Sequence, residues 1–344
     1  MPTQPTTMNA IVIDDYQAAL REAIRSLYVG ERPVPKLKAH QVLVKIHAAP
    51  CNPSDLMFIA GRYGVSKPLP AVPGWEGAGT VVAAGSLLGQ WLVGRRVAVG
   101  GQDRNRDGTW ADYVVASAFG CIPLRDGVDW DQGATLVINP LTAAGLLSTA
   151  KQQGHRAVVQ NAAAGQVGRM VIKLAQKAGT PLVNIVRRQE QVELLQQLGA
   201  EHILNSSDPD YGDQLRDRCE RLKVTAAFDA VAGPATGELF NAMARGGTVY
   251  VYGALSNKKS SDLNTGDIIF RGKRVEGFYL GAWTSGTNLL RALRAANEIQ
   301  QMMAAGEFQT TVQRRASFAE APEALLQYVD NMTEGKILFQ PEVP

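Results

Sequence analysis

The spacing of apolar residues changes along the chain near residue 126. Before that point, short apolar or alternating runs are separated by prolines and glycines, a pattern typical of β-strands joined by turns. These runs predict strands over residues 41–47, 79–84, 93–99 and 111–115. Residues 1–126 are therefore expected to form a small, barrel-like β-rich domain.

Beyond residue 126, apolar strands alternate with helices, which predicts a parallel, doubly wound α/β sheet over residues 127–287. The expected strands cover residues 157–160, 181–186, 226–231, 247–253 and 275–280, and a helix over 190–198 stops at Gly199. Helices over 288–305 and 320–332 precede a last strand, 336–339, which is expected to return to the first domain. Residues 288–344 would then complete that domain.

A glycine turn follows the predicted strand 157–160. Ala162, Gly165 and Gly168 form an A-x-x-G-x-x-G pattern between a strand and a helix. Gly165 lets the backbone approach a pyrophosphate, and Gly168 lets the helix pack closely on the strand. The helix N-terminus then offers free N–H groups to the phosphates. Because the first position is Ala, the pattern is a variant, and its strand–turn–helix context carries the prediction of a dinucleotide site.

Arg187 and Arg188 follow the next predicted strand, where an NAD site usually has an acidic residue for the ribose 2′-OH. Arginines suit a 2′-phosphate, because they form bidentate, charge-assisted hydrogen bonds. Two solvated arginines at the start of a loop are the alternative. The pair favours NADPH over NADH as the cofactor.

Composition excludes several classes of protein. The 344 residues are 45% hydrophobic and 19% charged, which is typical of a globular enzyme with two domains. The net charge of +3 and the lack of a basic run argue against nucleic-acid binding. Three scattered cysteines without a C-x-x-C motif indicate neither a disulfide framework nor a zinc ribbon. The polar opening, 1–7, and the absence of a long apolar run predict a cytoplasmic protein without a membrane segment.

Several blocks, taken in order, resemble the zinc-free medium-chain dehydrogenases/reductases over nearly the whole chain. The blocks are PCNPSD (50–55), GRYG (61–64), LPAVPGWEG (69–77), NPLTA (139–143), QNAAAGQVG (160–168), RGGT (245–248) and YVYG (250–253). The 2-enoyl thioester (enoyl-CoA/ACP) reductases and their quinone oxidoreductase relatives are the most similar members. The resemblance implies a GroES-like domain built from both chain ends, an inserted Rossmann domain, and an active site in the cleft. It also implies a homodimer, with 274–280 as the candidate edge strand.

Zinc-dependent members of this superfamily have C-x-x-D in the first block and G-H-E in a later one, and their Cys and His bind catalytic zinc. Here Asn52 and Trp75 occupy those two places, while Cys51 lies one residue out of register. The loop 101–112 has none of the cysteines of the structural zinc site. No metal is therefore expected. Without this Lewis acid, reduction of an activated C=C bond is favoured over alcohol oxidation.

Tyr63, in the GRYG block, matches the tyrosine that the enoyl thioester reductases use as proton donor. Reduction of an enoyl thioester needs a hydride at Cβ and a placed acid for the proton at Cα. A half-buried loop tyrosine without a chemical role is the alternative, and quinone reductases need no such acid.

The resemblance assigns further residues to the cofactor and the substrate. Trp75 lines the cleft, and a residue of its size places the width of the acyl pocket in doubt. Trp283 flanks the mouth of the site or, alternatively, lies at a dimer interface. Lys336 lies near the cofactor or, alternatively, on a strand surface. The implied cofactor-binding residues are Asn139, Ala164, Gly165, Gln166, Val167, Gly168, Arg187, Arg188, Tyr252, Gly253, Ala254, Leu255, Phe278, Tyr279, Leu280 and Lys336.

Three functions remain open on this basis. The first is an NADPH-dependent trans-2-enoyl thioester reductase acting on a CoA or acyl-carrier thioester. The second is an NADPH quinone or 2-alkenal oxidoreductase. The third is a non-catalytic nucleotide-binding protein, like the crystallins that this superfamily has supplied, which the glycine turn and Tyr63 disfavour.

Overall fold

The computed structural model describes residues 5–100 and 106–341. The expectations about the opening segment and the cysteine-free loop rest in part on residues 1–4 and 101–105, which lie outside this description. The chain divides into unit 1, residues 1–138 with 293–344, and unit 2, residues 139–292. Residues 127–138, expected in the nucleotide-binding domain, thus belong to unit 1.

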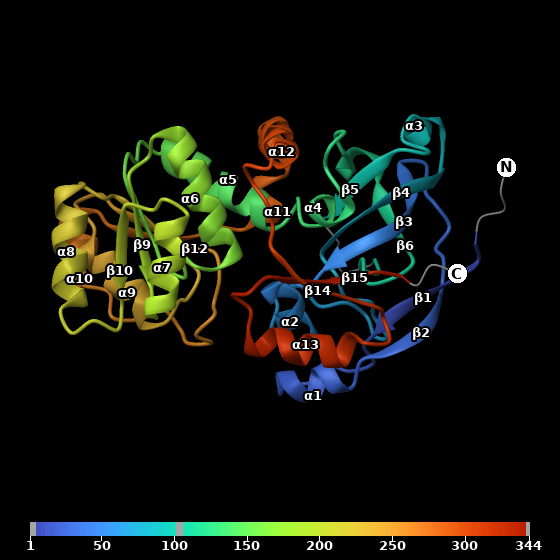
Figure 1. Cartoon of the computed structure of the whole chain (residues 1–344), viewed down its shortest axis with the longest axis horizontal. Helices are drawn as coiled ribbons and strands as arrows, with labels where there is room; N and C mark the ends of the chain where they lie inside the picture. Colours follow the sequence, from blue (N-terminus) through green and yellow to red (C-terminus); the bar gives the residue numbers. More distant parts are fainter. Residues whose placement is uncertain (1–4, 101–105, 342–344) are drawn as a thin grey trace. The chain divides into compact units, whose positions relative to one another are not determined.

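Unit 1 is β-rich (Figure 1). Its strands are β1 (Thr7–Val12), β2 (Tyr28–Pro33), β3 (Gln41–Pro50), β4 (Glu76–Ala84), β5 (Arg96–Gly100), β6 (Tyr113–Ser117), β7 (Ile122–Pro123), β14 (Val312–Ala316) and β15 (Lys336–Phe339). Its helices are α1 (Leu20–Arg25), α2 (Pro53–Ile59), α3 (Leu87–Gln90), α4 (Trp130–Ala134) and α13 (Ala321–Asp330). The second boundary between the units falls inside α12 (Leu289–Ala304).

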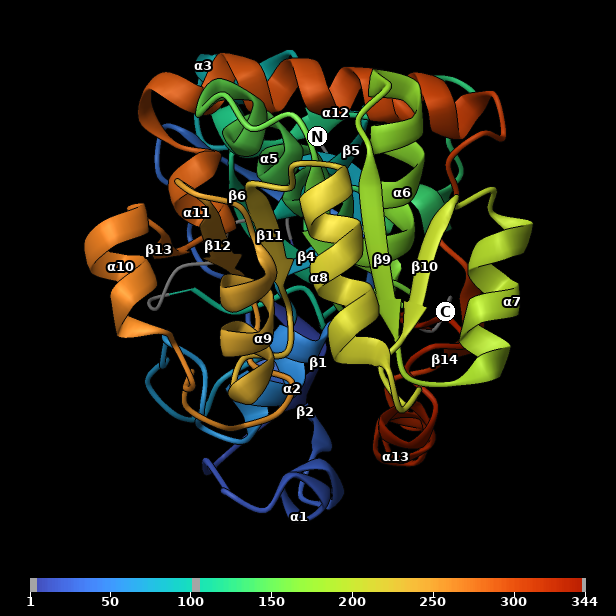
Figure 2. The same cartoon turned by 90° about the vertical axis from the view of Figure 1, so that its left-hand side faces the viewer.

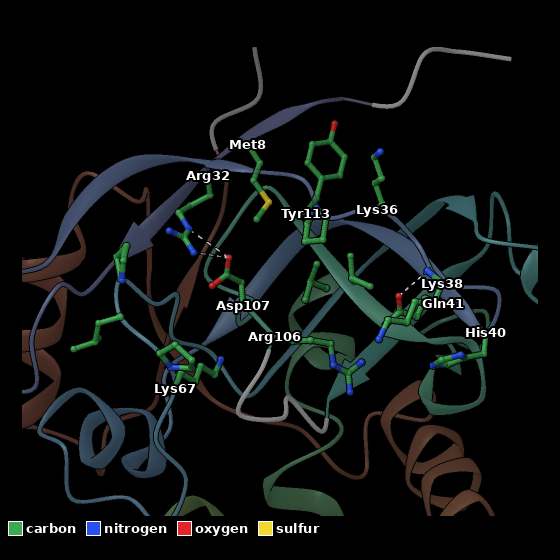
Figure 3. A pocket seen from close by; sticks show the side chains of 16 residues that line it. Met8, Arg32, Lys36, Lys38, His40, Gln41, Lys67, Arg106, Asp107 and Tyr113 are labelled. Carbon is green, nitrogen blue, oxygen red and sulfur yellow. Dashed lines mark hydrogen bonds and ion pairs between the residues drawn. The ribbon is translucent and has the colours of Figure 1, made fainter.

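The main sheet of unit 1 joins both ends of the chain. Its strand order is β14-β15-β3-β4-β5-β7, with β6 also pairing with β3, and β1 and β2 form a separate antiparallel pair. The C-terminal strand β15 pairs antiparallel with β3, so the predicted return of the last strand is confirmed. Strand β6 also lines a cavity of about 660 Å³ (Figure 3).

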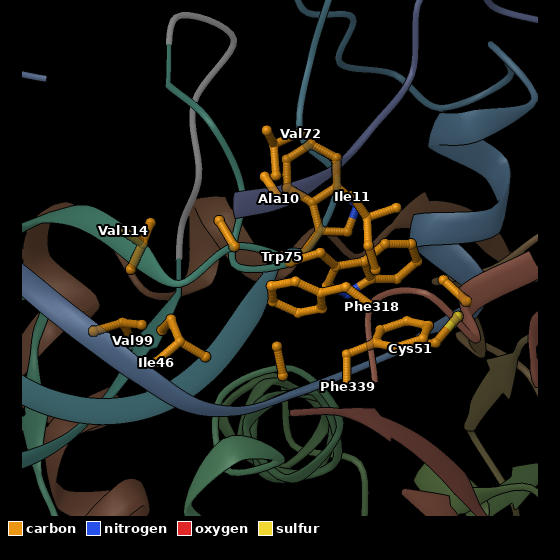
Figure 4. Packing of buried hydrophobic residues seen from close by; sticks show 14 of the residues in the cluster. Ala10, Ile11, Ile46, Cys51, Val72, Trp75, Val99, Val114, Phe318 and Phe339 are labelled. Carbon is orange, nitrogen blue, oxygen red and sulfur yellow. The ribbon is translucent and has the colours of Figure 1, made fainter. Parts of the chain in front are cut away.

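The core of unit 1 draws side chains from the beginning, the middle and the end of the chain (Figure 4). Ile11 of β1, Trp110, and Phe339 of β15 are all buried, and the rings of Trp110 and Phe339 lie 4.7 Å apart between centroids. Burial of these apolar groups stabilises the arrangement. The core therefore combines side chains of the N-terminal and C-terminal segments.

Unit 2 is a six-stranded, all-parallel sheet with the order β10-β9-β8-β11-β12-β13 and helices around it (Figure 2). The strands are β8 (Val158–Gln160), β9 (Leu182–Val186), β10 (His202–Asn205), β11 (Ala226–Asp229), β12 (Thr248–Val251) and β13 (Arg274–Gly277). The helices are α5 (Asn139–Gln152), α6 (Gln166–Ala178), α7 (Gln189–Gln197), α8 (Tyr211–Arg221), α9 (Pro234–Ala242), α10 (Thr265–Arg271) and α11 (Leu280–Trp283).

The predicted doubly wound sheet is confirmed, and its switch point lies between β8 and β11. From β8 the chain moves outward to β9 and β10, then returns through α8 to β11 on the other side of β8. In such sheets ligands bind outside the carboxyl ends of the strands at the switch point. Three expected strands end earlier than predicted: β11 ends at Asp229, β12 at Val251 and β13 at Gly277, and residues 280–283 form helix α11. Strand β13 is an edge of the described sheet, and its pairing with a second copy stays a prediction.

Among the residues at 5–100 and 106–341, no helix is both long enough and apolar enough to cross a membrane.

Candidate functional site

The glycine turn of unit 2 connects β8 directly to α6. Gly165 is the N-cap of α6 and provides no capping side chain. A Cβ on Gly168 would lie 2.5 Å from the carbonyl oxygen of Ala163, so only glycine fits where the helix meets the turn. Ala162 has a φ of 49°, a conformation that a non-glycine residue rarely adopts and that is often found at functional sites. The turn therefore has the shape of a phosphate cradle, with the N–H groups of the first turn of α6 at its open end.

Arg169, which the sequence analysis did not single out, is fixed beneath this turn. Its Nε donates a hydrogen bond to the Ala164 carbonyl oxygen at 2.6 Å. Burial lowers the pKa of its guanidinium. In the sequence, the position of Arg169 directly after Gly168 could have indicated that it lies at the glycine turn. A cation in the first turn of α6 adds positive charge next to the phosphate cradle.

Arg187 and Arg188 lie at the carboxyl end of β9, and both are exposed. Because β9 pairs in parallel with β8, both arginines are at the same edge of the sheet as the glycine turn. The backbone around Arg187 is held in place, since the Ser207 hydroxyl donates to its carbonyl oxygen at 2.8 Å and its N–H donates to Gln191 Oε1. Arg188 is the N-cap residue of α7. Their exposed position leaves both side chains accessible to a ligand.

Asn161 and Asp229 connect the carboxyl ends of β8 and β11 at the switch point. The amide nitrogen of Asn161 donates to Asp229 Oδ1 at 2.6 Å, and its amide oxygen accepts from the Ala230 N–H at 2.8 Å. Asp229 also accepts a hydrogen bond from the Thr236 hydroxyl. Satisfied buried polar groups of this kind make the strand ends rigid. Neither residue was expected from the sequence.

The other expected cofactor residues of unit 2 follow the carboxyl ends of β12 and β13. Residues 252–255 leave β12, and the Tyr252 N–H donates to the Asp229 carbonyl oxygen at 2.9 Å. Burial raises the pKa of Tyr252. The segment 278–280 follows β13, and the Phe278 N–H donates to the carbonyl of Val251. Both segments thus lie at the same sheet edge as the glycine turn, whereas Asn139 is buried at the start of α5.

Trp283 packs against α5. Its ring is 6% exposed, and a Cβ added to Gly145 would lie 3.0 Å from it. The ring thus contributes to packing inside unit 2, and its expected place at the mouth of the site or at a dimer interface stays a prediction.

In unit 1, Tyr63 is half-buried and follows α2. Its ring lies 5.0 Å from that of Trp75 between centroids. Trp75 also contacts Phe58, and the Lys67 ammonium lies 5.1 Å from the Trp75 ring. The Lys67 Nζ donates to the Val72 carbonyl oxygen at 3.1 Å. These contacts hold the Tyr63 ring within an aromatic and cationic cluster.

The indole nitrogen of Trp75 is buried and finds no hydrogen-bond acceptor among the described residues. Buried polar groups normally have a partner, so this indole N–H next to Tyr63 remains available to donate a hydrogen bond.

A series of hydrogen-bonded, buried polar side chains begins at Glu76, the residue after Trp75. The Lys336 ammonium donates to Asn52 Oδ1 at 2.5 Å and to the Cys51 carbonyl at 3.0 Å. The Asn52 amide nitrogen donates to Glu76 Oε1 at 2.9 Å. The other oxygen of Glu76 accepts from the backbone N–H groups of Val137 at 2.9 Å and of Ile138 at 2.8 Å.

Lys336 is only 1% exposed, so the alternative of a surface lysine is wrong. Burial lowers the pKa of its ammonium, and the nearby Glu76 opposes this effect. The structure places Lys336 against Asn52 and Cys51, inside unit 1.

The residues at the two expected ligand positions do not fit a catalytic zinc ion. Asn52 already joins Lys336 to Glu76, and Trp75 has no ligand atom. Burial raises the pKa of the Cys51 thiol well above its usual range, which disfavours the thiolate that a metal requires. Within the described ranges there is no group of three His, Cys, Asp or Glu residues that could hold a metal ion.

Two family models match the chain. A zinc-binding dehydrogenase model covers residues 167–295, and an alcohol dehydrogenase GroES-like domain model covers residues 38–126. The human mitochondrial enoyl-[acyl-carrier-protein] reductase is 33% identical over 261 residues, which are 72% of this chain and 66% of the human protein.

Two solved structures are also similar. The structure of a putative NADPH:quinone reductase from Mesorhizobium loti has a TM-score of 0.90 and 34% identity, and the match covers 98% of this chain and 100% of the other. The Etr1p complex with NADP and crotonyl-CoA has a TM-score of 0.80 at 20% identity, over 97% of this chain and 99% of Etr1p. The likeness to Etr1p supports the fold.

The buried network predicts a pH-dependent stability. Asp55 accepts a hydrogen bond from the backbone N–H of Asn52 at 2.8 Å, yet burial raises its pKa to about 7. The folded protein therefore binds a proton that the unfolded chain releases near pH 4. This difference in proton binding should lower the free energy of unfolding by at most about 1.4 kcal/mol per pH unit as the pH rises towards 7. Above pH 7 this decrease should level off.

Asp55→Asn keeps an oxygen for the backbone donor and removes the titration. The difference in unfolding free energy between Asp55→Asn and wild type, measured by urea denaturation from pH 5 to pH 8.5, should grow in favour of the variant up to about pH 7. The surface variant Asp126→Asn is the matched control. A pH-independent difference for Asp55→Asn would contradict the assignment.

Proposed function

The chain belongs to the medium-chain dehydrogenase/reductase superfamily, and within it we propose that this oxidoreductase is an NADPH-dependent reductase of the activated C=C bond in a trans-2-enoyl thioester. The observation that carries the proposal is the contact between Tyr63 and Trp75, which brings a phenol beside an indole N–H that has no acceptor among the described residues. The identity to the human enoyl-[acyl-carrier-protein] reductase supports the same reaction.

The described residues fit the cofactor. The glycine turn and the uncapped start of α6 would hold the pyrophosphate, with Arg169 beside them. Arg187 and Arg188 would bind the 2′-phosphate. Residues 252–255 and 278–280 would line the nicotinamide half, and Asn139 would lie near it. When bound, NADPH supplies the hydride that adds to Cβ of the thioester.

The chain's own acid in this proposal is Tyr63. As the enoyl thioester is reduced, negative charge develops on the thioester oxygen, and hydrogen-bond donors near that oxygen lower the barrier. The Trp75 Nε1 is a donor of this kind. The Tyr63 hydroxyl then gives its proton to Cα, while the contact with Trp75 keeps the ring in place. Trp75 also limits the width of the acyl pocket.

A quinone or 2-alkenal reductase is the second candidate. The 34% identity to the putative NADPH:quinone reductase, over nearly the whole of both chains, favours it. A quinone needs no placed acid because it can take its proton from water. The two candidates therefore differ in how strongly they depend on Tyr63.

In either case we propose that the protein works without zinc, because Asn52 and Trp75 stand at the ligand positions. Metal analysis of protein purified without chelators should find no stoichiometric zinc, and EDTA should leave the rate of NADPH oxidation unchanged. One tightly held zinc ion per chain would refute this.

Arg187 and Arg188 should set the preference for NADPH. Replacing both with Ala should weaken NADPH binding by roughly 2–4 kcal/mol, since each charge-assisted hydrogen bond contributes about 1.5–3 kcal/mol and such terms do not add fully. NADH binding, measured by the same fluorescence titration, should change little. The double variant Arg216→Ala/Arg221→Ala, on the exposed face of α8, controls for loss of charge. An equal loss for both cofactors would show that the arginines do not bind the 2′-phosphate.

Tyr63→Phe keeps the ring contact with Trp75 and removes only the acid. Turnover of crotonyl thioester should fall by about 10²–10⁴-fold, the usual contribution of general acid catalysis. NADPH affinity and quinone reduction should change little. Tyr28→Phe, which removes an exposed hydroxyl from β2, is the control. Wild-type enoyl reduction by Tyr63→Phe would remove Tyr63 from the mechanism and favour the quinone reductase.

A further inference from the structure

The cavity of about 660 Å³ in unit 1 is strongly basic (Figure 3). Five Lys and Arg residues line it: Arg32, Lys36, Lys38, Lys67 and Arg106. Among the described residues of the lining Asp107 is the one acid, so their combined charge is +4 (five minus one), more than the +3 of the entire chain. His40 also faces the cavity. Such a concentration of one sign attracts a ligand with several negative charges.

The cations surround the cavity on several sides. In Figure 3, Arg32 and Lys67 lie on one side, Lys38 and His40 lie on the other, and Arg106 lies between them. Asp107 is 3.3 Å from Arg32, so it compensates part of the charge on that side only. A ligand with phosphate groups at more than one point would match this arrangement better than a single small anion.

Apart from His40 and Gln41, the rest of the described lining is mostly apolar and includes flat or rigid side chains. Strand β6 contributes Tyr113, which is half-buried, and prolines 35, 68 and 70 form other parts of the wall. Aromatic and proline surfaces suit the face of a planar ring. The cavity therefore combines what a phosphorylated nucleoside needs: cations for the phosphates and an apolar surface for the base.

Contacts within unit 1 connect this cavity to the proposed proton donor. Lys67 lines the cavity, and its ammonium lies 5.1 Å from the ring of Trp75. The Trp75 ring is 5.0 Å from that of Tyr63. Two successive side-chain contacts thus lead from the basic cavity to Tyr63.

We propose that this cavity binds the phosphate-bearing end of the thioester substrate, the 3′-phosphoadenosine diphosphate of coenzyme A. The proposal rests on the proposed function, because an acyl-CoA has a phosphorylated nucleoside at one end and the reacting enoyl group at the other. The pantetheine arm joins the two ends. The cavity then selects the carrier of the acyl chain, while Tyr63 and Trp75 act on the acyl group.

The test compares two substrates that differ only at the carrier end. Crotonyl-CoA has the phosphates, and crotonyl-N-acetylcysteamine has the same reacting group without them. In the double variant Lys36→Gln/Lys38→Gln, KM for crotonyl-CoA should rise about tenfold, as expected for lost charge-assisted hydrogen bonds. The kcat for both substrates, KM for the phosphate-free thioester and Kd for NADPH should stay unchanged.

The matched control is Lys151→Gln/Lys177→Gln, which removes the same charge from exposed helical positions in unit 2. This control should leave both KM values unchanged. An unaltered KM for crotonyl-CoA in the cavity variant, or an equal rise for both thioesters, would overturn the proposal.

A binding measurement separates this proposal from the proposed function. The protein is first saturated with NADPH, so that the dinucleotide site is filled, and then titrated with adenosine 3′,5′-bisphosphate or with pyrophosphate. The bisphosphate should bind wild type and bind the cavity variant about tenfold more weakly. If wild type reduces no enoyl thioester but shows this difference, the proposed function fails and the cavity assignment stands. Absence of bisphosphate binding to wild type, or equally tight binding of pyrophosphate, would overturn the nucleotide assignment.

Discussion

The side chain of Asn52 holds three parts of unit 1 together. Its amide oxygen accepts from Lys336 of β15, and its amide nitrogen donates to Glu76 of β4. Glu76 in turn binds the backbone of Val137 and Ile138, directly before α5 begins. All the side chains in this chain of hydrogen bonds are buried, and buried charges are tolerated only when each has its partner. The C-terminal strand β15, the start of α2 and the backbone at residues 137–138 therefore depend on one another for their positions.

Asn52 and Trp75, which occupy the positions that would bind zinc in related dehydrogenases, make other interactions in this chain. Asn52 can donate and accept at once, which lets it join an ammonium to a carboxylate. Trp75 supplies a ring face for Tyr63 and an indole N–H without an acceptor among the described residues. A metal centre fixes its surroundings through ligand bonds, whereas here hydrogen bonds and ring packing fix the same region. In the proposed reaction the acid is accordingly a side chain, Tyr63, and not a metal ion.

The sequence predicted the features that depend on local patterns. Alternating strands and helices revealed the parallel sheet, and Gly168 was assigned the close packing that the structure shows. Features that depend on distant partners were missed. The burial of Lys336 cannot be read from its neighbours, because its partner Asn52 lies 284 positions away. The packing of Trp283 against α5 was not predicted either, because it depends on Gly145, which leaves room for the ring. The strand predicted to reach residue 280 ends at Gly277, since apolar residues 278–280 continue into a turn and a helix.

The pairing of β15 with β3 has a consequence for synthesis on the ribosome. Unit 2 is one continuous segment, so all its strands can pair before the last residues of the chain have emerged. Strand β3 can pair early with β4 and β6, but its third partner, β15, emerges only after the whole of unit 2. Until then the apolar surface that receives Phe339 is exposed. The nascent protein thus carries a finished domain and an unfinished one until β15 has left the ribosome and paired with β3.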